Sequence, residues 1–240
     1  MKISVIICYF NRRSLILHTL KTISQTSHKD IEVIIVDDAS DPEYQLDDIV
    51  NNYWFPIKLI KINPEQRWWK KDPAVCVGIA TEAAIGEVLV VQQPECCYVG
   101  DLLFDVYKNT TDNMVVSYSC YTLNECDTRL FINNQSIVYR NVQTGYKLEE
   151  STWLNHPVIL PVGYTYCMAV TKQTWKMLGG VDMDYAYGLG YTDIDLRERI
   201  YYSGFQMIIP SPDTSPFIVH LFHSSSGVRD DPLVEKNREI

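Results

Sequence analysis

Apolar and polar positions along the 240-residue chain alternate between strand-length runs and helical spacing. Residues 3–8 (ISVIIC) form an unbroken apolar run. Ile16, Leu20 and Ile23 then recur at intervals of four and three. The run is typical of a buried strand, and the recurring positions predict the apolar face of a helix. Strands that alternate with helices in this way indicate an α/β fold with a largely parallel sheet covered on both faces.

The alternation continues toward the carboxyl end. We expect further strands at residues 31–36, 57–62, 88–92, 114–118 and 166–170, and helices at residues 73–84, 101–106, 171–178 and 193–203. Residues 123–157 carry turn signals at Asn133, Asn134 and Gly145 with a weak apolar pattern, so we expect strand-rich loops there. No repeat or linker divides the chain, which predicts one domain over residues 1–240.

Composition narrows the class of protein. The chain is 46% hydrophobic, which is ample for a core and excludes a disordered protein. Its 21 basic and 30 acidic side chains leave a net charge of −9, which disfavours a nucleic-acid partner. No run reaches the roughly 20 apolar residues of a membrane span, the start carries no cleavable signal, and the seven cysteines form no CxxC pair. We therefore expect a reduced, cytoplasmic protein.

Polar residues follow the first two predicted strands at their carboxyl ends. Tyr9, Asn11 and Arg12 come after the first strand, and Asp37 and Asp38 come after the second. Open parallel sheets bind ligands just outside these ends, where an aspartate can accept from a ribose hydroxyl or a base N–H. The pattern fits a nucleotide site, or a turn that caps the next helix. Because no GxGxxG or GxxxxGK motif is present, a dinucleotide dehydrogenase and a P-loop enzyme are poor fits.

A loop followed by a helix carries a candidate general base. Two glycine-rich stretches, residues 179–182 (GGVD) and 188–190 (GLG), precede Asp193. Thr192 and Asp195 form a predicted N-cap pair, which places Asp193 in the first helical turn, where exposed N–H groups stabilise a carboxylate anion. An ionised carboxylate held there is a candidate base, or it merely complements the helix dipole.

A candidate divalent-metal set is divided between two strand ends. Residues 92–95 (QQPE) supply Glu95, and residues 220–223 (HLFH) supply His220 and His223. One carboxylate with one or two imidazoles suits Mn²⁺ or a related ion, which can offset the charge of a diphosphate leaving group. Two histidines at this spacing without a second carboxylate are also the pattern of ordinary structural histidines.

The order of these segments resembles that of family 2 glycosyltransferases with the GT-A fold. The resemblance is carried by residues 4–12 (SVIICYFNR), 32–40 (EVIIVDDAS), 84–89 (AIGEVL), 179–182 (GGVD) and 190–196 (GYTDIDL). It extends over about residues 3–223 and implies a Rossmann-like sheet with a smaller acceptor-side region. It divides the chain into a nucleotide-sugar-binding half (1–100), an acceptor-side half (101–225) and a C-terminal tail (226–240).

The resemblance implies an inverting hexosyltransferase that takes a sugar from a nucleoside diphosphate, usually UDP, with Asp193 as the catalytic base. Candidate donor contacts are Tyr9, Asn11, Arg12, Asp37, Asp38, Arg67, Gln92 and Gln93. Candidate ligands of Mn²⁺ or Mg²⁺ are Glu95, His220 and His223. Candidate acceptor contacts are Trp153, Tyr191, Thr192 and Asp195, with Trp153 either in a sugar-stacking wall or in ordinary packing. The acceptor is a hydroxyl of a glycan, glycolipid or protein.

Departures from the family pattern leave alternatives open. Residues 92–95 (QQPE) replace Asp-x-Asp, so that only Glu95 offers a carboxylate. The enzyme then still binds Mn²⁺, works without a metal, or has a degenerate site. Thr192 replaces a common acidic residue, and the Arg-Asn pair expected before Gly86 is missing. The stretch 67–71 (RWWKK) either replaces the missing pair, by reaching the diphosphate or stacking on a ring, or forms a solvated surface. The rival function is a non-catalytic sugar-nucleotide-binding or glycan-binding module with a degenerate metal motif.

Overall fold

A computed structural model describes residues 1–141, 150–224 and 231–240. Its strands are β1 (Ile3–Tyr9), β2 (Ile31–Asp37), β3 (Ile57–Lys61), β4 (Val88–Gln92), β5 (Cys96–Val99), β6 (Met114–Ser117), β7 (Cys120–Thr122), β8 (Thr152–Asn155), β9 (Cys167–Thr171), β10 (Gln206–Ile208) and β11 (Phe217–His220). Its helices are α1 (Arg13–Ile23), α2 (Ala74–Ala83), α3 (Leu102–Asn109), α4 (Glu125–Ile132), α5 (Lys172–Met177), α6 (Thr192–Tyr202) and α7 (Pro232–Arg238), with 3-10 turns η1 (Pro42–Tyr44), η2 (Pro64–Gln66) and η3 (Met183–Tyr187). Within these ranges, none of the helices has the length and apolar character that crossing a bilayer requires.

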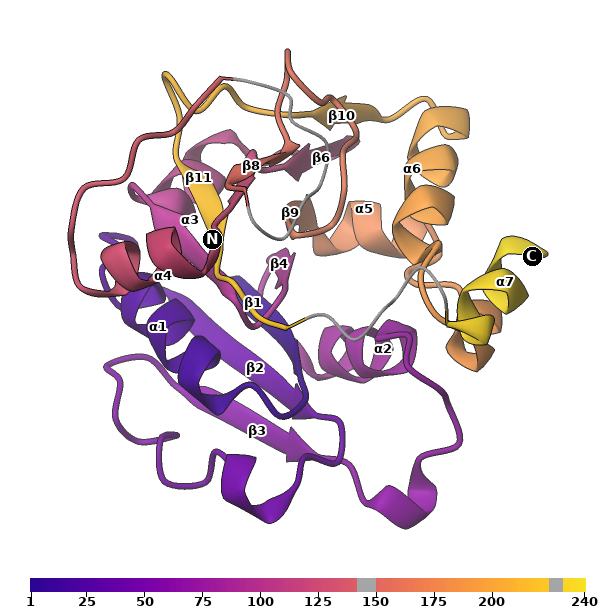
Figure 1. Ribbon diagram of the computed structural model, residues 1–240. Coiled ribbons are helices and arrows are strands. Elements are labelled where there is room, and N and C mark those ends of the chain that lie inside the picture. Colours follow the sequence, from indigo (N-terminus) through magenta and orange to yellow (C-terminus); the bar gives the residue numbers. More distant parts are fainter. Residues whose placement is uncertain (142–149, 225–230) are drawn as a thin grey trace.

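The larger sheet of the described chain has seven strands in the order β10, β6, β9, β4, β1, β2, β3 (Figure 1). Strands β1 to β4 run parallel, with Ile3 opposite both Ile31 and Val88. Strand β9 is antiparallel to β4 and β6. The predicted α/β fold with a largely parallel sheet is confirmed. Because parallel strands end at the same edge, the turns after β1 and β2 lie side by side.

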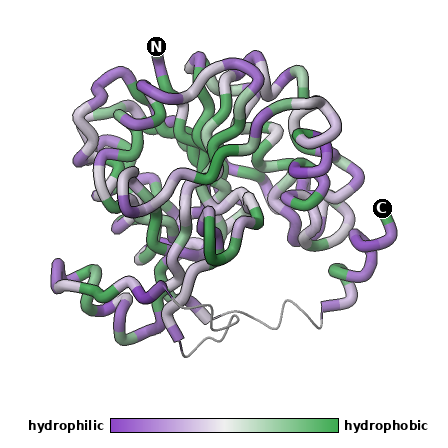
Figure 2. The backbone as a smooth tube through the Cα atoms, turned by 90° about the horizontal axis from the view of Figure 1, so that it is seen from above, coloured by the Kyte–Doolittle hydropathy of each residue, from purple (hydrophilic) through white to green (hydrophobic). Residues whose placement is uncertain are grey.

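Both faces of this sheet are buried because strand residues alternate between two layers of helices. Val5 and Ile7 of β1 belong to one core with α1 and α3, whereas Ile6 belongs to a second core with α2, α5 and α6. A strand that is buried on both faces needs a nearly continuous apolar run, which is the pattern of residues 3–8, where Ser4 is the one polar residue and is hydrogen-bonded. Figure 2 shows the hydrophobic segments gathered in the middle of the molecule.

A second, four-stranded sheet has the order β5, β11, β7, β8. It carries its own core, in which Tyr121, Trp153 and Phe217 pack together. Strand β11 is antiparallel to β5, with His220 opposite Cys96. This register brings the end of β11 beside Glu95, although the two segments are far apart in the sequence. The second sheet therefore builds part of the site.

The expectation of strand-rich loops over residues 123–157 is wrong for α4. Asn124 caps this helix by accepting a hydrogen bond from the Asp127 N–H at 2.8 Å, and Glu125 adds negative charge to the first turn. Of the helix residues, Thr128 alone is fully buried, and Phe131 and Ile132, which pack against the core of the second sheet, are adjacent rather than spaced by three or four, so the apolar periodicity of an amphipathic helix is weak. The turn signal at Gly145 lies outside the described residues.

Gly86, just before β4, stands where no side chain fits. Its N–H donates to Ser4 Oγ at 2.8 Å, and a Cβ at this position would lie 2.6 Å from the Ser4 backbone nitrogen. Because β1 cannot shift without disturbing the sheet, we predict that Gly86→Ala lowers the free energy of unfolding by about 1–3 kcal/mol. Urea unfolding measures the change.

The neighbouring substitution Ile85→Ala is the control, because Ile85 is 71% exposed. It should alter the free energy of unfolding by less than about 0.5 kcal/mol. A Gly86→Ala protein as stable as the parent would contradict the steric argument.

Candidate active site

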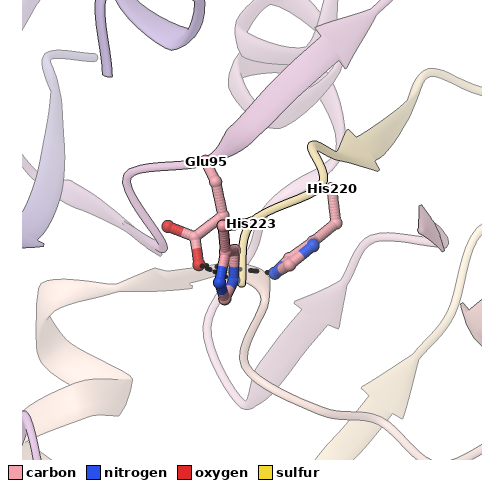
Figure 3. Close-up of side chains that lie close together, drawn as sticks. All are labelled: Glu95, His220 and His223. Atoms are coloured by element: carbon pink, nitrogen blue, oxygen red, sulfur yellow. Dashed lines mark ion pairs between the residues drawn. The ribbon is translucent and has the colours of Figure 1, made fainter. Parts of the chain in front are cut away.

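Glu95, between β4 and β5, is the centre of a buried cluster of polar groups. Its side chain is 4% exposed, and its Oε1 atom lies 3.4 Å from His220 Nε2 and 3.2 Å from His223 Nε2 (Figure 3). Arg12, in the turn between β1 and α1, donates to the same oxygen through Nη1. One carboxylate oxygen therefore faces three nitrogen atoms from two other segments of the chain.

The cluster keeps Glu95 ionised. Burial by itself raises the pKa of Glu95, but hydrogen bonds from His220 and His223, together with the charge of Arg12, hold that pKa well below its usual range. The second oxygen, Oε2, is buried and has no hydrogen-bond partner among the described residues. One ligand atom from each of Glu95, His220 and His223 lies within 4.8 Å of the others. A carboxylate and two imidazoles at this separation, with one carboxylate oxygen unpartnered, fit a divalent ion such as Mn²⁺.

Gln92 and Gln93 stand beside this cluster without joining it. The Gln92 side chain is buried, its amide donates to the Cys96 carbonyl at 3.2 Å, and its oxygen accepts from the Tyr98 hydroxyl. The Gln93 N–H donates to the Tyr166 carbonyl at 3.1 Å. Gln92 therefore stabilises the turn between β4 and β5 from inside. Both of its amide atoms are bound by protein groups, so neither is available to a nucleotide-sugar.

Asn11 ties the turn after β1 to the turn after β2. Its Nδ2 donates to Asp41 Oδ2 at 2.7 Å, its Oδ1 accepts from the Asp41 N–H at 2.9 Å, and its N–H donates to Ser40 Oγ at 3.0 Å. Asp37 Oδ1 accepts from the Ser40 N–H at 2.9 Å. The two turns, which the sequence predicted to be neighbours, thus form one polar surface at the carboxyl ends of β1 and β2, and Asp37 is buried beneath it at 2% exposure.

Two of the predicted aromatic contact residues lie inside the protein. Tyr9 is buried in the core, its hydroxyl donates to the Tyr44 carbonyl, and burial raises its pKa to about 12. Trp153 is 3% exposed, with ring centroids 4.9 Å from Tyr121 and 5.7 Å from Phe217. Neither ring has a face free for a ligand, so Trp153 belongs to ordinary packing.

Asp38 binds the basic aromatic stretch that follows β3. Arg67 Nε and Nη2 each donate to one oxygen of Asp38 at 2.8 Å, and Trp69 Nε1 donates to Oδ1 at 2.9 Å. This two-point pair raises the pKa of Arg67. The adjacent Trp68 is half-exposed and packs on Tyr187 with centroids 5.3 Å apart. Both oxygens of the Asp38 carboxylate therefore accept hydrogen bonds from protein groups. The sequence pattern did not show these contacts with Arg67 and Trp69.

Asp193 lies in the first turn of α6, as the pattern predicts, but the helix begins differently. Tyr191 is the N-cap residue, with a φ of 70° and no side-chain cap hydrogen bond, and Thr192 is the first helical residue. Asp195 accepts from Arg199 Nε at 2.9 Å and Nη2 at 2.6 Å. The predicted capping pair of Thr192 and Asp195 is wrong, because Arg199 one turn later binds the carboxylate that would have closed it.

Tyr166 packs against the Glu95 cluster and also feels the charge of Asp193. Its ring meets the His220 ring edge-on with centroids 5.9 Å apart. Burial raises the pKa of Tyr166, and the nearby charge of Asp193 adds to the shift. Burial also raises the pKa of Asp193. The candidate base and the candidate metal ligands, which come from separate segments of the sequence, thus both influence one tyrosine, the base through its charge and the ligands through the His220 ring.

Asp72 is a buried carboxylate that the sequence analysis did not single out. Its Oδ1 accepts from the Ala74 N–H at 2.9 Å, and its Oδ2 accepts from the Gly190 N–H at 3.0 Å and the Thr192 hydroxyl at 3.4 Å. Burial raises the pKa of Asp72 to about 7 although these hydrogen bonds lower it. In the sequence, Asp72 before Pro73 reads as an ordinary helix start, so only the fold reveals its contact with the segment that precedes Asp193.

Comparisons with known proteins agree with this architecture. The model of the family Glycosyl transferase family 2 matches residues 4–151. A search of curated proteins found no significant match. Three solved structures are similar in fold: mannosyltransferase PcManGT from Pyrobaculum calidifontis in complex with GDP-Man and Mn²⁺ (18% identity, TM-score 0.58, covering 94% of this chain and 58% of that one), S. aureus TarS 1-349 in complex with UDP-GlcNAc (14%, 0.65, 96% and 61%), and GalNAc-T7 with UDP, GalNAc and Mn²⁺ (12%, 0.66, 99% and 47%). The chain spans about half the length of these structures, and the likeness shows the GT-A fold.

Asp72 predicts a dependence of stability on pH. Its pKa is about 7 in the folded protein and about 3.9 in an unfolded chain, so between these values the folded state holds a proton that the unfolded state has lost. The contribution of Asp72 to stability therefore falls as the pH rises from 4 to 7. An asparagine at this position cannot ionise, so we predict that Asp72→Asn costs more free energy of unfolding at pH 5 than at pH 8, by about 1–3 kcal/mol.

Urea unfolding of both proteins at the two pH values measures this difference. The matched control is Asp184→Asn, because Asp184 is exposed, and its effect should be the same at both pH values. A cost of Asp72→Asn that does not change with pH would contradict the burial argument.

Proposed function

The chain belongs to glycosyl transferase family 2, and we propose that it is an inverting transferase that moves a hexosyl group from a UDP-linked donor to an acceptor hydroxyl. One observation carries this proposal. The cluster of Glu95, His220 and His223 contacts Tyr166 through the His220 ring, and the charge of Asp193, in the first turn of α6, also acts on Tyr166. A base beside a site for a divalent ion is the arrangement that nucleophilic displacement of a diphosphate needs.

The donor nucleotide is assigned to the polar surface formed by the turns after β1 and β2. Open α/β sheets bind nucleotides at this edge, and Asn11 and Asp37 lie there. The PcManGT structure holds GDP-Man, whereas the TarS and GalNAc-T7 structures hold UDP-GlcNAc and UDP, which favours a uridine donor here. Because Arg67 and Trp69 occupy the Asp38 carboxylate, we assign these three residues to the wall of the nucleotide site rather than to direct recognition of the base.

The proposed reaction is a single displacement. The oxygen of the acceptor hydroxyl forms a bond to the anomeric carbon while the bond from that carbon to the diphosphate oxygen breaks, and its electron pair leaves with the nucleoside diphosphate. Asp193 takes the hydroxyl proton. Because the hydroxyl attacks from the face opposite the leaving group, an α-linked donor gives a β-linked product. The acceptor itself, a glycan, glycolipid or protein, is assigned to the half of the chain after residue 100.

Glu95, His220 and His223 would hold the divalent ion, which when bound supplies positive charge for the departing diphosphate. Two of these three ligands are imidazole nitrogens, which suit Mn²⁺ better than Mg²⁺, because Mg²⁺ prefers oxygen ligands. The PcManGT and GalNAc-T7 structures both contain Mn²⁺, which supports the choice.

A non-catalytic sugar-nucleotide-binding or glycan-binding module is the alternative function. The observation in its favour is the segment 92–95, where Gln92 and Gln93 replace carboxylates of the family pattern and Gln92 is committed to Cys96 and Tyr98. Turnover decides between the two functions, since a binding module retains nucleotide binding without transfer.

Calorimetric titration of UDP, first with Mn²⁺ and then with EDTA, tests the donor class without knowledge of the sugar. We predict a dissociation constant in the micromolar range with Mn²⁺ and binding weaker by about tenfold or more in EDTA. Glu95→Gln should remove the difference between the two buffers, and Glu82→Gln, at an exposed position of α2, should preserve it. The absence of UDP binding in both buffers would refute the proposed donor.

Asp193→Asn tests the general base. We predict that turnover falls by at least about 100-fold, because the amide cannot accept the hydroxyl proton, while the affinity for UDP changes by less than about threefold. Release of UDP from the preferred UDP-sugar measures the rate. The exposed Asp184→Asn variant carries the same chemical change and should keep the parent rate. Parent-like turnover of Asp193→Asn would remove Asp193 from the mechanism.

A further inference from the structure

Arg12 already pairs with the carboxylate that an ion would need. Both histidine Nε2 atoms and the Arg12 guanidinium converge on the same oxygen, Oε1, whereas Oε2 is buried and has no partner within the described chain. The Glu95 side chain is 4% exposed, so water screens its negative charge little and its electrostatic interactions with neighbouring groups are strong. The guanidinium already neutralises that charge before any ion binds.

A divalent ion and the Arg12 guanidinium cannot both remain at Glu95 without strong repulsion. An imidazole that binds a metal is neutral, so with one carboxylate, one guanidinium and two imidazole ligands, an added Mn²⁺ would bring the buried group to a net charge of about +2. In an Asp-x-Asp site a second carboxylate would offset part of that charge, but Gln92 and Gln93 are neutral here. The ion is therefore bound at the cost of the contact between Arg12 and Glu95.

Arg12 is placed so that it can leave Glu95. Its side chain is 33% exposed, and it lies at the start of α1 without a side-chain cap hydrogen bond. A partly exposed guanidinium regains water when it moves, and this hydration offsets part of the cost of breaking its ion pair. The next residue, Arg13, is bound instead to Asp48 and to the Gln45 carbonyl, away from the cluster.

We propose that Arg12 is a built-in counter-charge that competes with the divalent ion for Glu95 and so lowers the affinity of this site for metal. The guanidinium pairs with Glu95 when the ion is absent and is displaced when the ion binds to Glu95, His220 and His223. A cation therefore faces the buried carboxylate in both states. The inference rests on the proposed function only for the choice of Mn²⁺ as the ion.

Binding of Mn²⁺ alone, without nucleotide, tests the competition. Electron paramagnetic resonance counts free Mn²⁺ in titrations of the parent protein and of the variants Arg12→Gln, Arg12→Lys, Arg13→Gln, Glu95→Gln and Arg12→Gln/Glu95→Gln. We expect Arg12→Gln to bind Mn²⁺ at least about tenfold more tightly than the parent, because the competing charge is gone. Arg12→Lys keeps the charge and should stay within about threefold of the parent, and Arg13→Gln should match it. Adding Glu95→Gln should abolish the gain.

The proposal is overturned if Arg12→Gln binds Mn²⁺ no more tightly than the parent protein, or not at all. It is also overturned if the gain survives Glu95→Gln, since the ion would then lie elsewhere. Far-ultraviolet circular dichroism checks that each variant is folded, and Arg12→Met, which retains the apolar stem, repeats the test should Arg12→Gln unfold. Because no nucleotide is present, an error in the proposed donor leaves this result unchanged.

Discussion

The structure around the site depends on one buried negative charge. Glu95 lies where the seven-stranded sheet passes into the four-stranded sheet, and an ionised carboxylate there is costly unless it is paired. Its partners come from the turn after β1 and from the end of β11, whose position is set by the pairing of His220 with Cys96. The Leu221 N–H also donates to the Glu95 carbonyl at 3.0 Å. The Glu95 charge is therefore paired with the histidines only when β11 and β5 are in this register, so the two features depend on each other.

The larger sheet could be predicted from the sequence because its information is local. A short and almost entirely apolar run such as residues 3–8 is typical of a strand buried on both faces. Ile6 and Ile7 indeed pack into different cores. The second sheet lacks such a signal, since its strands are short and β5 pairs with β11, from which about half of the chain separates it. Helix α4 has a capped start with charge in its first turn, and its apolar contacts, Phe131 and Ile132, are confined to its last residues, so hydrophobic periodicity gives a weak signal for it.

For the site, the residue types and their positions at strand ends were sufficient to select the candidate residues. They did not reveal what each side chain contacts. Glu95, His220 and His223 lie within reach of one another. Tyr9 and Trp153 are buried, which depends on how neighbouring elements cover them rather than on their place in a motif. Asp72 had no signal at all, because its hydrogen bonds with Gly190 and Thr192 exist only after two remote segments have packed.

The segment from Arg67 to Asp72 links the nucleotide side of the site to the base. At one end, Arg67 holds Asp38 after β2, and at the other end Asp72 accepts from the Gly190 N–H before α6. Gly190 and Tyr191 have φ values of 77° and 70°, and the second is a strained conformation for a residue with a side chain. Asp72 offsets that strain by binding the residues on both sides of Tyr191, through the Gly190 N–H and the Thr192 hydroxyl. The start of α6, and with it Asp193, is therefore held in place relative to the turn after β2 by buried carboxylate hydrogen bonds rather than by the helix's own cap.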